Sequence, residues 1–360
     1  MSGVHQFLPT WEPGAIGAHA REVRRLMRER GLSSEVFTYE AVPTMAGEAH
    51  HYRAYGREVR AHADDLLVYH CAVGSEVADF VCGRRERVVV DYHNVTPPEY
   101  FAAWDPVVAE NLEWGREQLA GLAGRSVLGV ADSGFNEGEL REVGFRRTGV
   151  VPVLLDLDGL VGECDVGVLE RLSGGRGACW LFVGRLAPNK AQHDLVKSLA
   201  VYRRVYDPDA RLVLVGAASS SAYEVALRRF VSELGLEGAV ELAGSVSSGE
   251  LGAYFRAADV FVCVSEHEGF CVPLLEAMAY GVPVVAFGAA AVPETLADAG
   301  LVLDVKSPGV VAAAVSRVLG DAVLREGLVG AGRARLEEFS LERSRARLWE
   351  ALNPLIEAGT

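Results

Sequence analysis

The sequence is poor in cysteine and lacks the spacings that usually bind a metal ion or build a disulfide framework. Its six cysteines are scattered over 360 residues, without a Cys-x-x-Cys pair or a regular Cys/His pattern. The chain is therefore no disulfide-stapled domain, and a reducing cytoplasm is the setting we expect. We also expect no metal site, because no Asp-x-Asp motif lies next to the candidate binding residues described below.

Long apolar runs and an excess of positive charge are missing as well. No apolar run approaches the roughly 20 residues that cross a bilayer, and the first residues lack the charged-then-apolar pattern of a secretion signal. The 35 basic residues face 49 acidic ones, which gives a formal net charge of −14. This balance argues against a nucleic-acid partner, since nucleic-acid binding needs a basic surface. We therefore expect a cytoplasmic protein without a transmembrane segment.

The length and the hydrophobic content suit an α/β protein of two domains. Half of the residues are hydrophobic, and short runs of β-branched residues alternate with helical stretches. This alternation predicts two Rossmann-like, doubly wound parallel sheets, in domains of residues 1–155 and 156–340. Ligands of such sheets bind at the carboxyl ends of the strands. We expect strands at residues 4–8, 35–39, 65–70, 88–92, 126–131, 149–154, 179–184, 211–215, 239–242, 260–264, 282–286 and 301–303.

The most informative stretch is VFVCVSEHEGFCVPLLEAMAYGVPVV, residues 260–285. It predicts a buried strand, a tight polar turn with Gly269, a helix with Pro273 as its first residue, and a second buried strand. The helix start offers the amides of Leu274 and Leu275 to an anion.

Glutamates flank this predicted anion site. Glu268 precedes the helix and Glu276 lies in its first turn. Each glutamate alone is equally typical of a solvated loop acid or of a residue that complements the helix dipole. Amides for phosphate with carboxylates for hydroxyl groups nevertheless fit one ligand class well, a nucleoside diphosphate sugar.

A pair of basic residues follows the strand at 179–184. Arg185 and Lys190 lie five residues apart on a strand-to-helix loop. A guanidinium fork and a compact ammonium can converge on one diphosphate. Taken alone, the pair is also typical of two exposed bases on a loop.

The segments SEHEGFCVPLLEAMAYGVPVVA and VGRLAPNK resemble the signatures of retaining family 4 glycosyltransferases. The first has the Glu-x7-Glu spacing from Glu268 to Glu276, although Cys271 stands where the family usually has glycine. The resemblance implies the GT-B fold, two Rossmann-like domains facing across a cleft. A last helix at about residues 341–360 would pack back on the first domain.

The resemblance also assigns roles to these residues. Arg185 and Lys190 would bind the pyrophosphate, Glu268 the donor sugar and Glu276 the ribose. Turns after other strands would complete the donor site. The further donor residues that we expect are Gly14, Gly17, Gly184, Gly216, Ser245, Val246, Gly269, Phe270, Cys271, Val272, Leu274 and Leu275.

The first domain offers a candidate catalytic histidine. His93 directly follows the predicted strand at 88–92. It either fixes its own loop or lies near the donor sugar as a neutral imidazole, and the resemblance favours the second role. Weaker candidates for the acceptor side are His70, Ser75, Asn94, Thr96 and Ser133, of which Ser133 is more typical of a helix cap.

These observations predict a bacterial glycosyltransferase that moves a hexosyl unit, with retention, from a UDP-, GDP- or ADP-linked sugar to a hydroxyl acceptor. The acceptor would be a polysaccharide, a glycolipid or a secondary metabolite. We expect no cofactor and no required metal ion. A nucleotide-sugar epimerase, a phosphorylase of the same architecture and a non-catalytic nucleotide-sugar-binding protein are the alternatives. A homo-oligomer stays open, as does membrane contact through the arginine-bearing helix at 18–30, which is less favoured.

Overall fold

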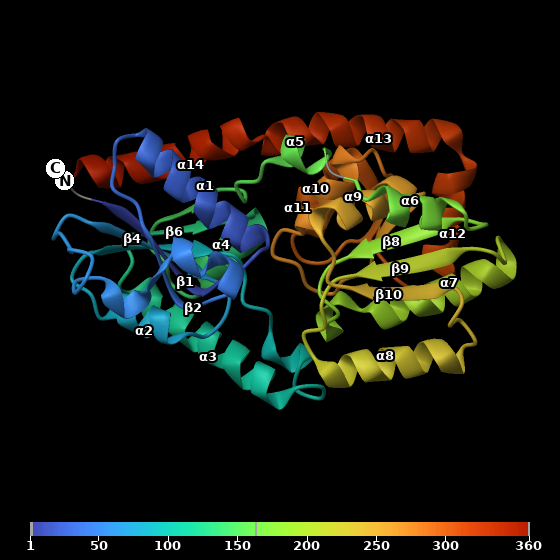
Figure 1. Ribbon diagram of the computed structural model, residues 1–360, viewed down its shortest axis with the longest axis horizontal. Coiled ribbons are helices and arrows are strands. Elements are labelled where there is room, and N and C mark those ends of the chain that lie inside the picture. The colour runs from blue at the N-terminus through green and yellow to red at the C-terminus, as the bar shows by residue number, and fades with distance from the viewer. Residues whose placement is uncertain (1–2, 163, 359–360) are drawn as a thin grey trace. The chain divides into compact units, whose positions relative to one another are not determined.

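The computed structural model describes residues 3–162 and 164–358. The chain forms two compact units (Figure 1). Unit 1 comprises Met1–Glu99, Pro106–Leu155 and Phe339–Thr360, and unit 2 comprises Tyr100–Asp105 and Asp156–Glu338. The chain therefore leaves unit 1 twice, once for a six-residue segment and once for the whole of unit 2.

Unit 1 is built on a seven-stranded parallel sheet in the order β3-β2-β1-β4-β5-β6-β7. Each predicted strand of this half is present, and the two-residue β3 is an addition too short to leave a hydrophobic pattern. The strands are β1 Val4–Trp11, β2 Val36–Ala41, β3 His50–His51, β4 Leu66–Cys71, β5 Arg87–Tyr92, β6 Leu128–Ala131 and β7 Thr148–Val150.

Helices cover both faces of this sheet. In Figure 1, α1 and α14 lie on one side of it and α2 and α3 on the other. The α-helices are α1 Ala15–Glu29, α2 Glu76–Cys82, α3 Pro106–Ala123, α4 Gly134–Glu142 and α14 Leu341–Glu357, and the 3-10 turns are η1 Pro43–Glu48, η2 Tyr52–Ala54 and η3 Pro98–Tyr100.

The last helix belongs to the core of unit 1. Leu348, Leu352 and Leu355 of α14 are buried with Val23 and Met27 of α1 and with apolar residues of the sheet. Residues more than 300 positions apart in the sequence thus share one hydrophobic cluster.

Unit 2 is built on a six-stranded parallel sheet in the order β10-β9-β8-β11-β12-β13. Its strands are β8 Cys179–Val183, β9 Arg211–Val215, β10 Val240–Gly244, β11 Val260–Cys263, β12 Val284–Phe287 and β13 Gly300–Leu303. Its helices are α5 Leu157–Leu160, α6 Val166–Ser173, α7 Gln192–Val205, α8 Ser221–Glu233, α9 Ser248–Ala257, α10 Val272–Ala279, α11 Val292–Leu296, α12 Pro308–Gly320 and α13 Ala322–Leu336, with 3-10 turns η4 Pro188–Lys190, η5 Ala297–Ala299 and η6 Glu337–Phe339.

Each sheet has one point at which the strand order reverses. In unit 1 the chain runs outward from β1 to β3 on one side and from β4 to β7 on the other. In unit 2 it runs from β8 to β10 and then from β11 to β13. In open parallel sheets, ligands bind at such a point, outside the carboxyl ends of the two central strands. The sites are therefore expected after β1 and β4 in unit 1 and after β8 and β11 in unit 2.

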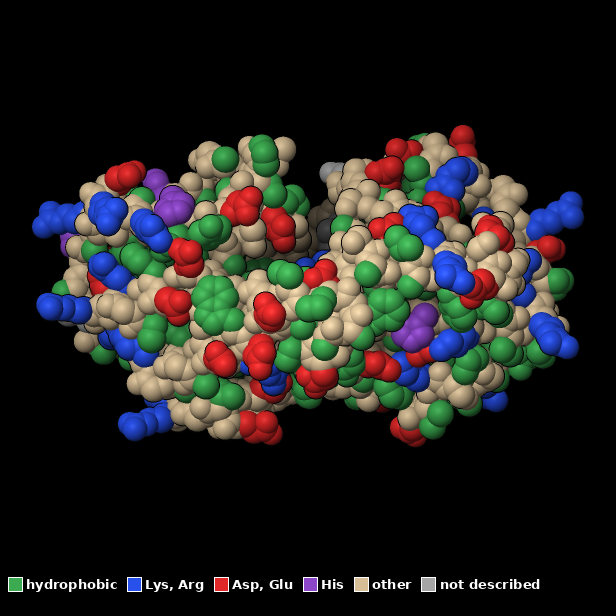
Figure 2. All heavy atoms as spheres, turned by 90° about the horizontal axis from the view of Figure 1, so that it is seen from below, with side chains coloured by type: hydrophobic (Ala, Val, Ile, Leu, Met, Phe, Trp, Pro, Cys, Tyr) green, Lys and Arg blue, Asp and Glu red, His purple; other side chains and the backbone are tan. Residues whose placement is uncertain are grey.

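The surface carries charge of both signs. Figure 2 shows acidic and basic side chains interspersed with apolar ones across the face in view. Among the described residues, no helix has the length and hydropathy needed to span a bilayer.

Candidate functional site

The switch point of unit 2 brings together two of the predicted residues. Lys190 ends η4 after β8, and Glu268 lies in the loop after β11. The Lys190 Nζ atom is 2.6 Å from the Glu268 Oε2 atom. The two loops are also joined by their backbones, since the Glu266 amide donates to the Asn189 carbonyl at 2.8 Å. A pair 78 residues apart in the sequence therefore forms one local site.

The ion pair keeps Lys190 charged. Burial opposes the ammonium charge, but the Glu268 carboxylate outweighs it and raises the pKa of Lys190 above its usual value. The lysine side chain is 21% exposed and that of Glu268 only 8%. A cation at the rim of the sheet, backed by a buried carboxylate, suits a ligand that carries both phosphate and hydroxyl groups.

Arg185 lies on the same loop after β8 as Lys190. The residue is exposed, and its carbonyl accepts a hydrogen bond from Gln192 Nε2 at 2.9 Å, which fixes the backbone of the loop. Among the described residues, the Arg185 guanidinium has no ion-pair partner. It is therefore available to an anion.

Glycines let the strand ends of this sheet approach closely. Gly216 follows β9 with a φ of +140°, and a Cβ atom on it would lie 2.2 Å from the Gly184 carbonyl oxygen. Gly216 is thus required by backbone contact between neighbouring loops, and Gly184 by its own φ of +153°. Ser245 and Val246, which follow β10, are exposed and partly exposed, respectively.

The helix start differs from the prediction in one respect. Helix α10 begins at Val272, so Pro273 is its second residue. The Leu274 amide donates to the Cys271 carbonyl at 3.0 Å and is not free. Leu275 is the fourth helical residue, where intrahelical hydrogen bonding begins. The amides without an intrahelical acceptor are those of Cys271 and Val272. A contact of Leu274 or Leu275 with the donor stays a prediction.

Cys271 takes the left-handed backbone conformation, which glycine adopts more easily than other residues. Its φ is +68°. Its thiol shares a hydrogen bond with the thiol of Cys263, the last residue of β11. This hydrogen bond lowers the pKa of Cys263 and raises that of Cys271, where burial adds to the increase.

The loop between them is well anchored. The Phe270 carbonyl accepts a hydrogen bond from Thr295 Oγ1 at 2.7 Å, and the Glu268 carbonyl accepts one from the Ala291 amide at 3.2 Å. Gly269 lies between these two anchors. The loop that carries Glu268 is therefore held from both sides.

Glu276 is a carboxyl group in an unusual state. Its side chain is half-buried in the first turns of α10, and burial raises its pKa to about 7. Near neutral pH it exists both as an acid, which can donate a hydrogen bond, and as a carboxylate. Either form can bind a hydroxyl group.

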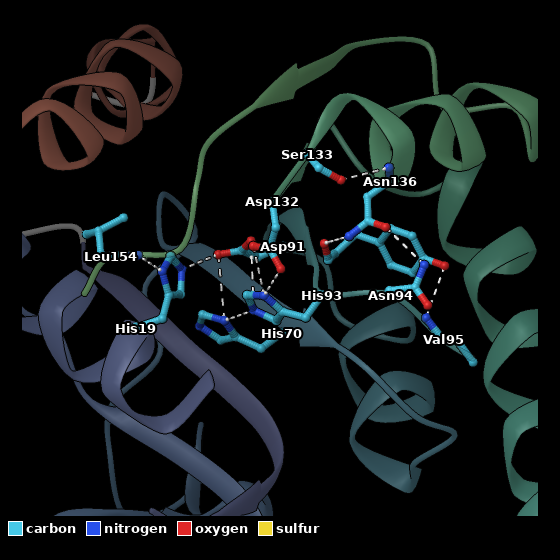
Figure 3. A network of polar contacts seen from close by, with 11 residues as sticks. His19, His70, Asp91, His93, Asn94, Val95, Asp132, Ser133, Asn136 and Leu154 are labelled. Carbon is cyan, nitrogen blue, oxygen red and sulfur yellow. Dashed lines mark hydrogen bonds and ion pairs between the residues drawn. The ribbon is translucent and has the colours of Figure 1, made fainter. Parts of the chain in front are cut away.

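In unit 1 the predicted histidines lie inside a buried polar network. Figure 3 shows the rings of His19, His70 and His93 gathered around Asp91. His93 Nδ1 lies 3.0 Å from Asp132 Oδ2, and His93 Nε2 lies 2.9 Å from His70 Nδ1. The planes of the His70 and His93 rings are parallel to within 3°, and the ring centroids are 5.2 Å apart. They therefore lie end to end, as in a linear N–H···N hydrogen bond.

The partners of these rings define where the protons are. The Asp132 carboxylate only accepts, so His93 Nδ1 donates to it. His70 Nε2 faces the Gln6 Oε1 atom at 2.9 Å and donates to it, which leaves His70 Nδ1 as an acceptor. His93 Nε2 must then donate as well, and His93 is an imidazolium. Burial opposes this charge, but Asp132 and Asp91 raise the pKa of His93 to about 9.

His19 and Asp91 complete the network and were not among the sequence candidates. His19 Nε2 lies 2.8 Å from Asp91 Oδ2, and His19 Nδ1 accepts the Leu154 amide at 2.9 Å. The second contact makes Nδ1 the acceptor, so Nε2 carries the proton. Asp91 could have been found as an acid within the apolar strand VVVDY, which is costly without partners.

The partners of His93 within unit 1 favour the imidazolium over the predicted neutral imidazole, and they enclose its ring in this conformation. The His93 side chain is 2% exposed and both of its nitrogens are engaged within unit 1. The His70 ring is fully buried in this conformation, and its contact with an acceptor stays a prediction. The role of His93 in catalysis stays a prediction.

Two of the other acceptor candidates cap helices. Ser75 and Ser133 accept hydrogen bonds at the starts of α2 and α4. Asn94, with a φ of +76°, donates to Asn136 and Glu139 and so fixes the loop after β5. Thr96 is partly exposed nearby. The structure thus gives Ser75, Ser133 and Asn94 structural partners.

The glycines after β1 shape the other side of the unit 1 switch point. Gly14 is the cap of α1, with a φ of +147°. A Cβ atom on Gly17 would lie 2.2 Å from the Glu12 carbonyl oxygen. Both glycines are therefore needed for the turn itself, and their predicted contact with a donor stays a prediction.

Part of the second unit is similar to a known protein family. Residues 174–335 match the family model described as "Glycosyl transferases group 1". This match covers less than half of the chain and lies within unit 2. This range contains the Lys190–Glu268 pair, Arg185 and Glu276.

Curated relatives of this chain carry glycosyltransferase names. A D-inositol 3-phosphate glycosyltransferase of Geodermatophilus obscurus is 33% identical over 239 residues, which cover 64% of this chain and 52% of that protein. A GDP-mannose-dependent alpha-(1-6)-phosphatidylinositol monomannoside mannosyltransferase of Mycobacterium tuberculosis is 37% identical over 160 residues, which cover 42% of this chain and 40% of that protein. The chain spans about half, or less, of the length of these relatives.

Solved structures confirm the predicted fold. Sucrose-phosphate synthase from Thermosynechococcus elongatus matches with a TM-score of 0.78 at 18% identity. The match covers 99% of this chain and 100% of the synthase chain. The Anabaena Alr3699/HepE protein in complex with UDP-glucose matches with a TM-score of 0.77 at 18% identity. That match covers 98% of this chain and 99% of the Anabaena chain. The chain has the GT-B fold of two Rossmann-like parallel sheets.

Proposed function

We propose that this protein is a retaining glycosyltransferase that moves a hexosyl unit from a nucleoside diphosphate sugar to a hydroxyl acceptor. The observation that carries the proposal is the Lys190–Glu268 pair at the switch point of the unit 2 sheet. It joins a phosphate-binding cation and a hydroxyl-binding carboxylate within one site. The group 1 family over residues 174–335 supports the same reaction class.

The chemical task is to let a nucleoside diphosphate leave the anomeric carbon. Negative charge then grows on the phosphate oxygens, so fixed cations and amides aimed at them stabilise the transition state. Arg185 and Lys190 supply the cations, and the start of α10 supplies the amides of Cys271 and Val272. These groups neutralise the diphosphate without a required metal ion, and the reaction needs no cofactor.

The carboxyl groups position the donor. Glu268 accepts hydrogen bonds from the sugar hydroxyls, while Lys190 donates to its Oε2 atom. Glu276 binds the ribose. Retention follows from attack on the same face as the leaving group, with the departing phosphate taking the acceptor's proton. The His93 imidazolium adds a buried positive charge at the end of β5, where unit 1 would meet an anionic ligand.

The names of relatives indicate which donors to test first. One relative is described as GDP-mannose-dependent, and one solved structure holds UDP-glucose. We propose a UDP-, GDP- or ADP-linked hexose as donor and a hydroxyl group of a polysaccharide, glycolipid or secondary metabolite as acceptor.

The proposal is tested by binding and hydrolysis of nucleotide sugars. We expect one of these donors to raise the thermal midpoint of the protein and to be slowly hydrolysed. Lys190→Ala should lower the hydrolysis or transfer rate by about 100- to 1000-fold, because it removes a charge that acts on the leaving group. Arg185→Ala should show a loss of the same kind, and because Arg185 is exposed this variant carries little risk of misfolding.

Lys197→Ala is the matched control. Lys197 is a half-exposed lysine of α7 that pairs with Asp194 away from Glu268. Its variant should keep the wild-type rate, and chelation of metal ions should leave that rate unchanged. If the wild-type protein binds a nucleotide sugar but neither hydrolyses nor transfers it with any acceptor pool, the enzyme proposal is refuted. An inverted anomeric product would refute retention.

A further inference from the structure

Two thiols and a carboxylate meet inside the donor loop of unit 2. Cys263 ends β11, Cys271 precedes α10, and Glu268 lies in the loop between them. Their two sulfur atoms and a carboxylate oxygen lie within 4.8 Å of one another. All three residues are buried, with exposures of 0%, 8% and 7% for Cys263, Cys271 and Glu268.

These groups form a set of ligands with a defined preference. Thiolates favour thiophilic cations, and two sulfur atoms with one carboxylate oxygen form a three-ligand set that leaves a fourth position open on Zn²⁺. Burial keeps competing water away. Cys271 also takes a backbone conformation that disfavours a side chain, so its thiol is present despite a local conformational cost.

The second cluster of this kind in the described chain, His19–His70–Asp91–His93, is not suited to a metal ion. His19 Nδ1 accepts the Leu154 amide, so Nε2 carries a proton and has no lone pair to offer. His70 and His93 lie end to end, with a proton shared along one line. In the thiol cluster the two sulfur atoms contact each other, and Cys263 Sγ also lies 3.4 Å from Ser265 Oγ. Each thiol can give up its proton to a metal ion, and the Lys190 contact occupies only Oε2 of Glu268.

We propose that Cys263, Cys271 and Glu268 bind one thiophilic divalent cation, of which Zn²⁺ is the representative. Binding releases the two thiol protons and forms two sulfur–metal bonds and one oxygen–metal bond. Three negative charges then meet two positive charges on the ion and one on Lys190, whose Nζ atom contacts Glu268. The site is therefore neutral as a whole, with Lys190 orienting the carboxylate.

A consequence rests on the proposed function. Glu268 cannot hold the metal ion and accept hydrogen bonds from the donor sugar at the same time. The cation is therefore an inhibitor that competes with the nucleotide sugar, and chelation does not harm the enzyme.

The site is tested with Co²⁺ and Zn²⁺ alone, on the full chain after chelation and thiol reduction. Co²⁺ bound by thiolates absorbs in the near ultraviolet, and we expect this band to saturate at one Co²⁺ per chain and to vanish when Zn²⁺ is added. Cys263→Ser and Glu268→Gln should weaken Co²⁺ binding by about tenfold or more. The double variant Cys82→Ser/Cys164→Ser, which removes two partly exposed thiols elsewhere, should keep the band.

Cys271→Gly is the most informative variant. Glycine suits the φ of +68°, so the variant should fold, and yet it removes one thiol ligand. Loss of the band in folded Cys271→Gly supports the site. No band in the wild-type protein, or an unchanged band in both cysteine variants, overturns it. A wild-type band that a nucleotide sugar does not displace leaves the metal site in place and refutes its overlap with the donor site.

Discussion

Glu276 shows how one residue responds to the environment that its helix creates. The sequence indicates a glutamate in a first helical turn, where a carboxylate is usually favourable. The structure places it half-buried, and desolvation raises its pKa to about 7. Burial therefore outweighs the helix dipole at this position.

This pKa predicts a pH-dependent stability. Between about pH 4.5 and 7 the folded state binds more protons at Glu276 than the unfolded chain, so the free energy of unfolding falls as pH rises through this window. Glu276→Gln has no titrating carboxyl group at this position, so it should not lose stability over this pH range. The variant should match the wild-type protein at about pH 4 and exceed its stability by up to about 3 kcal/mol at about pH 8. Thermal or urea unfolding at both pH values measures the difference.

Glu326→Gln, an exposed position on α13, is the control and should show no such pH-dependent gain. A difference between Glu276→Gln and wild type that is the same at both pH values would show that burial does not act on the carboxyl charge.

At the scale of the element, the loops after the strands of unit 2 depend on close backbone approach. Gly216 after β9 packs against Gly184 after β8, and its amide donates to the Gly244 carbonyl at 2.8 Å. The three neighbouring strands β8, β9 and β10 therefore end in loops that contact one another directly. A side chain at the middle position would force them apart.

Gly216→Ala should destabilise unit 2 by about 2 kcal/mol or more, because it combines a positive φ with a Cβ atom too close to a carbonyl oxygen. Urea unfolding checks this value. Gly238→Ala is the matched control, since no atom lies within 4 Å of its added Cβ and its φ is not positive. Equal stability of the two variants would mean that the loop relaxes without cost.

At the scale of the whole molecule, the chain returns to its first unit at the end. Helix α14 supplies Leu348, Leu352 and Leu355 to the core of unit 1. The hydrophobic core of unit 1 thus includes residues that follow all of unit 2 in the sequence. Unit 1 depends on the C-terminal helix for its stability.

Leu352→Ala should destabilise unit 1 by about 2 to 5 kcal/mol, the usual cost of such a cavity, and leave unit 2 unchanged. Hydrogen exchange of backbone amides, measured by mass spectrometry, reports on the stability of each unit separately. Backbone amides of 66–71 should exchange faster in the variant, and those of 211–215 should keep wild-type rates. Glu350→Ala, an exposed change on the same helix, should alter neither. Faster exchange in both units would show that they unfold together.

Local patterns in the sequence were sufficient for the strands and for the segments that follow them. Apolar runs such as residues 211–215 predict buried strands because burial on both faces leaves no polar alternation. Arg185, Lys190 and Glu268 were recognisable because each follows such a strand, and parallel strands direct their carboxyl ends to one edge. The fold class followed from the same alternation.

Only the tertiary structure decided which side chains meet. The ion pair of Lys190 with Glu268, the contact of Cys263 with Cys271 and the network around Asp91 all join groups from different elements. Their charge states depend on burial and on those partners, which is why the sequence favoured a neutral His93 whereas Asp132 and Asp91 raise the pKa of His93 to about 9. The sequence by itself determined the strands and the residue types at their ends. Packing determined the partners and the protons, because desolvation and hydrogen bonding act through space and not along the chain.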